Sequence, residues 1–137
     1  MAQPDRINEV ADTIAEFVDA VNRGDRPNAL AHFTGDATIV EDLAPFRWHG
    51  PNAGAEWMLA MWENAQRSGI SAVVMEISPP MRIEVEADFA YAVVPGLLTY
   101  QGNESTLRSD GFLTFSLIAS DGRWLISALV WTGPAAS

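Results

Sequence analysis

The sequence predicts an α+β fold in which a cone-shaped, curved antiparallel sheet is wrapped on three N-terminal helices. Before Ser71 the apolar residues recur mainly at three- and four-residue steps, as in helices, and after it they alternate with polar residues, as in strands. No linker or repeat divides the chain, so residues 1–137 are expected to form one domain. The expected elements are two helices within 5–34, a first strand at 37–42, a third helix at 52–68 and an antiparallel sheet at 71–132.

The first helix is expected over residues 5–23, where one face is apolar and the other carries acids. Gly24 is a natural C-terminal stop, and Asp25 followed by Pro27 opens a second short helix that runs through Phe33. These signals place two helices before the first strand.

The third helix is expected to start at Asn52, a residue that favours the N-terminal cap, and to end near Ser68 and Gly69. One stripe of this helix is apolar and aromatic, formed by Trp57, Met58, Met61, Trp62 and Ala65. Packing of the helix on the sheet explains such a stripe better than a cofactor site does.

Five strands are expected after the third helix. Pro95-Gly96 interrupts the third of them and indicates a bulge or an edge position. Asp121-Gly122 forms a tight turn between the last two. The predicted strands are 71–77, 81–86, 89–101, 107–120 and 123–132.

Two neighbouring acids, Glu41 and Asp42, end the first strand, and residues 46–51 are expected to form a loop after them. Alternation along the strand places Ile39 and Glu41 on one face and Asp42 on the other, so only one acid can point into the cone unless a bulge intervenes. We therefore expect one acid to be a general base with a raised pKa, if the protein has a chemical site. Phe17, Phe112 and Trp131 are the apolar side chains expected around it. The alternative is a structural acid that pairs with Arg47, Arg82 or Arg108, or that accepts hydrogen bonds from loop amides.

Other side chains can serve either a site or the core. His49 can be a second proton carrier at the mouth of the cone or a solvated loop residue, and His32 is expected to be structural or exposed. Tyr91 and Tyr100 can donate phenol hydrogen bonds to a ligand or simply pack in the sheet. Tryptophans can surround a planar apolar ligand or fill a small barrel, and this applies to Trp48, Trp57, Trp62 and Trp131.

Composition excludes several classes of function. The formal net charge is −10 and all eight basic residues are arginine, which argues against binding nucleic acid or an anionic membrane. The absence of lysine and cysteine excludes Schiff-base and thiol chemistry, and His32 and His49 lie too far apart for a local metal motif. We therefore expect no metal and no cofactor. The N-terminus lacks the apolar segment of a signal peptide, so the expected location is the cytoplasm.

Several segments resemble the nuclear-transport-factor-two-like superfamily, which includes ketosteroid isomerases and polyketide cyclases of the SnoaL type. The matching segments are residues 17–25, residues 33–42, Gly50 before the third helix, and residues 121–126 ahead of Trp131. Together they cover nearly the whole chain. The resemblance implies the cone-shaped fold, a small-molecule pocket and dimerisation through the outer face of the sheet, but one fold hosts many activities.

Against the ketosteroid isomerases, the catalytic tyrosine of the first helix falls on Phe17, which cannot donate a hydrogen bond. Their catalytic aspartate falls on Glu41 without a gap or on Asp42 with one inserted residue, and their second oxyanion donor falls near Thr114. A pocket aromatic on their last strand falls on Trp131. On this alignment the chain has a possible base but lacks the strong oxyanion donors of the isomerases. Each such donor typically contributes about 10²–10³ in rate. This argues against a true steroid isomerase.

Together these arguments predict a pocket for a small apolar molecule, carbonyl-bearing or cyclic. If the protein is an enzyme, we expect cofactor-free isomerisation, dehydration or cyclisation; the alternative is a non-catalytic ligand-binding or dimerisation module. The expected catalytic residues are Glu41, Asp42 and His49. The expected ligand-binding residues are Phe17, Trp48, Trp62, Tyr91, Phe112, Thr114 and Trp131.

Overall fold

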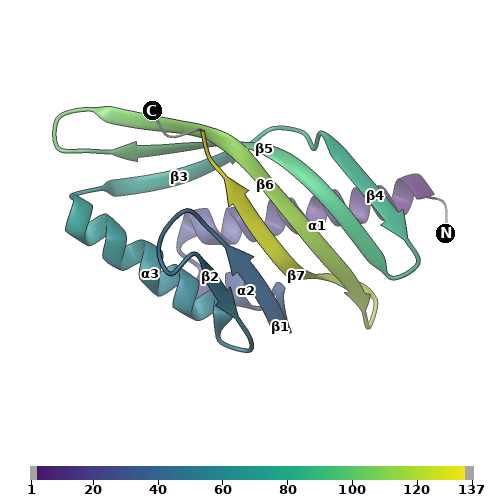
Figure 1. The fold of residues 1–137 in the computed structure, drawn as a ribbon. Helices are drawn as coiled ribbons and strands as arrows, with labels where there is room; N and C mark the ends of the chain where they lie inside the picture. Colours follow the sequence, from purple (N-terminus) through teal and green to yellow (C-terminus); the bar gives the residue numbers. More distant parts are fainter. Residues whose placement is uncertain (1–2, 135–137) are drawn as a thin grey trace.

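The computed structural model describes residues 3–134 and has three helices and one seven-stranded sheet in that part of the chain (Figure 1). The helices are α1 (Gln3–Arg23), α2 (Arg26–Leu30) and α3 (Ala53–Ser68). The strands are β1 (Phe33–Val40), β2 (Arg47–His49), β3 (Ser71–Ile77), β4 (Arg82–Glu86), β5 (Phe89–Gln101), β6 (Thr106–Ser120) and β7 (Arg123–Thr132). The predicted α+β class is confirmed.

The order of strands across the sheet is β2-β1-β7-β6-β5-β3, and β4 pairs with β5 beside β3. All pairs are antiparallel except β1 and β7, which are parallel, so the sheet is mixed rather than wholly antiparallel as predicted. Strand β1 precedes α3 in the chain and pairs with the last strand, β7. No hairpin joins the two strands, so they can run parallel. Helix α1 crosses one face of the sheet and α3 lies beside β1 and β2 (Figure 1).

The helix ends follow the local sequence signals. Gly24 and Gly69 adopt left-handed conformations at the ends of α1 and α3, with φ of 70° and 68°. The Asp25 side chain accepts a hydrogen bond from the backbone N–H of Asn28 at 3.3 Å and caps α2. Helix α2 ends at Leu30 rather than Phe33, because Phe33 already belongs to β1. No described helix is both long and apolar enough to span a membrane.

The largest difference from the prediction lies around the first strand. Strand β1 starts four residues early, at Phe33, and ends at Val40, before the two acids. The segment expected to be a loop contains the short strand β2, which pairs Trp48 with Ile39. Trp48 is buried between the exposed Arg47 and His49, and this period-two pattern is the signal of a strand.

Pro95-Gly96 does not interrupt β5, which pairs with β6 along its whole length without a register shift. On the edge of β5 that faces away from β6, the neighbouring strand changes at these two residues. Residues 89–93 pair with β4, and residues 96–101 pair with β3. Pro95 has no N–H to donate and lies at the gap between these two strands, where its carbonyl accepts a hydrogen bond from Ser78 at 3.0 Å.

The core lies between α1 and the inner face of the sheet. Val10, Ile14 and Phe17 of α1 are almost completely buried against Phe115 and Leu129. Fully burying an apolar side chain of this size contributes about 1.5–3 kcal/mol. These contacts hold α1 on the sheet and leave the space between its C-terminal half, α3 and β3 less filled.

Candidate functional site

A cavity of about 650 Å³ opens between the C-terminal half of α1, helix α3 and the inner face of the sheet. Its walls are mainly apolar and aromatic, and its rim carries the amides of Asn22, Asn64 and Gln66. A site of this size and character suits a small organic molecule.

Glu41 borders the cavity directly after the last residue of β1 and is half-buried. Burial raises the pKa of the Glu41 carboxyl to about 7, and the neighbouring Asp42 carboxylate adds to the increase. The indole N–H of Trp57 donates a hydrogen bond to Glu41 Oε1 at 3.4 Å, which opposes part of that shift.

Among the described residues, no arginine forms an ion pair with Glu41. Arg82 pairs instead with Glu84 at 3.1 Å, on the same outer strand. The alternative in which an arginine neutralises Glu41 is therefore not what the structure shows. An acid without a cationic partner in a largely apolar cavity is able to carry a proton near neutral pH.

Asp42 also lines the cavity but is exposed, at its rim. The expectation that only one acid faces the cone fails because β1 ends at Val40 and strand alternation does not continue through the acids. A tight turn follows, in which Phe46 donates to the Leu43 carbonyl at 2.8 Å and Glu41 donates to the Phe46 carbonyl at 3.2 Å. The turn lets both acids border the same space.

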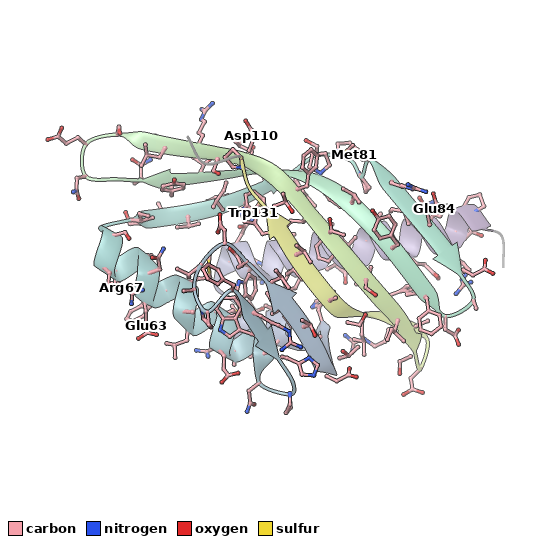
Figure 2. The ribbon with its side chains drawn as sticks, viewed as in Figure 1. Glu63, Arg67, Met81, Glu84, Asp110 and Trp131 are labelled. Atoms are coloured by element: carbon pink, nitrogen blue, oxygen red, sulfur yellow. The ribbon has the colours of Figure 1, made fainter. Side chains whose placement is uncertain are left out.

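Aromatic side chains from three elements form much of the wall. Phe17 of α1 lies nearly parallel to Trp57 of α3, with ring centroids 6.5 Å apart and planes inclined by 22°. Trp131, labelled on β7 in Figure 2, is almost buried, whereas Trp62 stands at the mouth with 61% of its surface exposed. Phe17, Trp62 and Trp131 were expected at the site, and the structure brings them together with Glu41.

Gly111, paired with Gly96 across β6 and β5, makes room for Trp131. A Cβ on Gly111 would lie 2.6 Å from Cη2 of the indole, and one on Gly96 would lie 3.5 Å from Cζ3. No other residue type leaves this space at Gly111, where the same Cβ would lie 2.3 Å from the carbonyl oxygen of Thr132. Gly111 therefore leaves the space that the indole occupies in the wall of the cavity.

Three of the expected ligand-binding residues lie on the opposite face of the sheet. Leu113 is buried on the inner face, so Phe112 and Thr114 face outwards, and Phe112 borders a separate outer depression of about 440 Å³. Tyr91 is also on the outer face, 44% exposed, with the Arg82 guanidinium 5.8 Å from its ring centroid.

The remaining expected residues lie close to the cavity but not in its wall. Trp48 is buried on β2, where it pairs with Ile39 of β1, and the exposed His49 ring shares a hydrogen bond with Thr38 Oγ1 at 2.7 Å from its Nδ1. His32 is buried: its Nδ1 lies 2.8 Å from the Asn28 carbonyl oxygen, a structural contact. Within residues 3–134 no group of three or more acidic or histidine side chains is placed to hold a metal ion.

Two residues of the site, Trp57 and Tyr100, were left open between ligand contact and packing and were not among the expected ligand-binding residues. In the structure the Trp57 N–H donates to the acid, and Tyr100 is the one phenol that lines the cavity within the described residues. The position of Trp57 in the second turn of α3 is a usable signal, because α3 packs against β1, which the acids follow.

The fold and the site define a cone-shaped α+β protein with a small-molecule cavity and an acid at its wall. Residues 4–130 match the model of the SnoaL-like domain, and the chain belongs to this family. The predicted resemblance to the nuclear-transport-factor-two-like superfamily is confirmed.

Three solved structures show the same fold. A ketosteroid isomerase-like protein from Erwinia carotovora is 19% identical, with a TM-score of 0.75 over 95% of this chain and 97% of that chain. A nuclear-transport-factor-two-like protein of unknown function from Pseudomonas putida is 18% identical, with a TM-score of 0.76 over 99% and 92%. A hexachlorocyclohexane dehydrochlorinase, LinA type 2, is 16% identical, with a TM-score of 0.75 over 99% and 95%. A search among curated proteins found no match.

Proposed function

We propose that the cavity binds a small, largely apolar, carbonyl-bearing or cyclic molecule and that Glu41 moves a proton on it without a cofactor. The observation that carries this proposal is the Glu41 carboxyl itself, which borders an aromatic cavity with a pKa near 7 and no arginine partner among the described residues. General acid–base catalysis is most efficient when the pKa of the group lies near the working pH.

In this proposal Glu41 removes the proton from the carbon next to the carbonyl group and returns it to the same or a conjugated carbon. The residue at the position of the isomerase tyrosine, Phe17, cannot stabilise the enolate. Tyr100 is the phenol that lines the cavity, and it can donate a hydrogen bond to a ligand carbonyl.

The decisive experiment follows deuterium uptake at the α-carbon of cyclic ketones in D₂O by NMR. We expect the wild-type protein to accelerate uptake and Glu41→Gln to lose about 10²–10⁴-fold of that acceleration, the usual contribution of a positioned base. Glu63→Gln is the matched control, because Glu63 is exposed on α3 and projects away from the sheet (Figure 2). Equal rates in wild type and Glu41→Gln would contradict the proposal.

The second candidate is a non-catalytic ligand-binding protein of the same fold. The size and openness of the cavity favour binding as much as catalysis, because a cone filled by its own side chains would serve neither. Binding of cyclic ketones without Glu41-dependent exchange would support this alternative.

We also propose that the outer face of the sheet forms a homodimer. Phe89, Tyr91 and Phe112 are exposed on this face, away from α1. Light scattering after gel filtration tests the proposal: the wild type is expected to be a dimer and Tyr91→Asp a monomer. Leu59→Asp is the control, because Leu59 is similarly exposed on α3. A monomeric wild type would refute it.

A further inference from the structure

The charged side chains around the cavity are all of one sign. Among the described residues that line it, Glu41 and Asp42 are charged, and no arginine or histidine joins them. The sequence also has no lysine that could supply a positive charge there. A carboxylate or phosphate on a ligand would therefore enter without a cation to neutralise it, which is unfavourable.

Three arginines are adjacent in sequence to cavity residues, Arg23, Arg67 and Arg108, and none of them lines the cavity; Arg108 is exposed on β6. Arg23 binds the carboxylates of Asp19 and Asp25 at 2.8 and 3.2 Å, at the end of α1. Arg67, in the last turn of α3, is exposed and projects away from the sheet (Figure 2). An anionic ligand would find no cationic side chain in the wall.

The uncharged part of the wall favours a cation as well. Five aromatic rings line the cavity, from Phe17, Trp57, Trp62, Tyr100 and Trp131. The face of an aromatic ring attracts a cation through its quadrupole, most strongly in tryptophan, and such rings surround ammonium ligands in known recognition sites. Aromatic walls and carboxylates thus select the same ligand charge.

The two acids repel each other when both are ionised and the cavity is empty. Glu41 and Asp42 are adjacent, and the Asp42 carboxylate disfavours ionisation of Glu41. A cation beside them removes this repulsion, so its binding is coupled to loss of the Glu41 proton. The formal net charge of −10 attracts cations towards the protein at longer range.

We propose that the cavity prefers a small organic cation, an ammonium group on an apolar or aromatic body, over neutral and anionic molecules of the same shape. This inference rests on the proposed function, since it concerns the same cavity and narrows its ligands to those that also carry an ammonium group. Asp42 at the rim holds the ammonium group, and Glu41, freed of its proton, faces the body of the ligand.

Three probes with the same phenyl ring test the preference: phenethylamine, phenethyl alcohol and phenylpropionate. Titration followed by tryptophan fluorescence is expected to give phenethylamine a Kd at least about tenfold below that of the alcohol at near-neutral pH, with phenylpropionate the weakest. Asp42→Asn should lose most of this preference and keep the affinity for the alcohol. Asp110→Asn is the control and should keep the preference for the amine, because Asp110 is an exposed acid of β6 that does not line this cavity.

Proton release supplies a second readout. Calorimetry in two buffers of different ionisation enthalpy, slightly below neutral pH, should show that phenethylamine releases protons on binding and that the alcohol does not. Glu41→Gln should abolish the release; Asp42 and Tyr100, the other titratable groups that line the cavity among the described residues, are retained in that variant.

Equal affinity for the amine and the alcohol, tightest binding of phenylpropionate, or no binding of any probe would overturn the inference. These outcomes are separable from failure of the proposed function. A protein that binds amines selectively but shows no Glu41-dependent deuterium uptake keeps the inference and loses the function. One that exchanges neutral ketones without preferring amines keeps the function and loses the inference.

Discussion

The Trp57 indole donates a hydrogen bond from Nε1 to Oε1 of Glu41 across 3.4 Å, joining α3 to the end of β1. The two residues are sixteen positions apart in the sequence and come from elements that pack against each other. This contact orients the acid at the wall of the cavity. It also opposes the effect of burial on the pKa of Glu41.

Replacing Trp57 by phenylalanine should raise the pKa of Glu41 further, because the N–H that stabilises the ionised carboxylate is lost while the aromatic wall is kept. An NMR titration of the Glu41 side-chain carboxyl measures the change. Trp62→Phe is the control, since Trp62 also lines the cavity but donates no hydrogen bond to the acid within the described residues. An unchanged or lower pKa in Trp57→Phe would show that the contact does not act on the acid.

Replacing Asp42 by asparagine should move the pKa of Glu41 in the opposite direction, downwards. The Asp42 carboxylate raises that pKa by repulsion, and the amide keeps the shape of the side chain without its charge. The same titration applies, with Asp36→Asn as the control, because Asp36 is exposed on β1 and does not line the cavity. A pKa that stays near 7 would mean that burial alone sets it.

The stability of the fold should depend on pH through Glu41. The folded state raises the pKa from the ordinary 4.5 to about 7, so between these values the folded state binds more protons than the unfolded state. The contribution of Glu41 to the free energy of unfolding is therefore largest below about pH 4.5. It falls by about 3 kcal/mol at most as the pH rises to about 7.

Glu41→Gln isolates this effect from the other carboxylates of an acidic chain. Relative to wild type, the variant should gain free energy of unfolding as the pH rises through this window and show a constant difference above it. Urea unfolding at a series of pH values measures the difference. A constant difference across the whole range would contradict the raised pKa.

Gly111→Ala should destabilise the protein by about 1–3 kcal/mol, because the added methyl group meets the Thr132 carbonyl oxygen and the Trp131 indole. Thermal unfolding measures the loss, and tryptophan fluorescence reports displacement of the indole. Gly35→Ala, where a Cβ meets nothing within 4 Å, is the matched control. Equal melting temperatures for the two variants would mean that the sheet adjusts without strain at Gly111.

Much of the fold was predictable because its signals are local. The apolar period of α1, the glycines that end α1 and α3, and the turn at Asp121-Gly122 each depend on residues a few positions apart. Strands β3 to β7 were placed within one residue of their observed ends for the same reason. The end of β1 and the strand β2 were not, because β2 has only three residues, too few for a pattern to stand out, and its position depends on pairing with β1.

The sequence by itself determined the α+β class, the net negative charge of the chain and the pair of acids beside a strand. Only the tertiary structure decided which side chains meet those acids. Trp57 and Tyr100 reach the cavity, whereas Phe112 and Thr114 face away from it, since a shift of one residue in a strand exchanges its two faces. Side-chain direction at a site is set by register and by strand ends, and both depend on partners distant in the sequence.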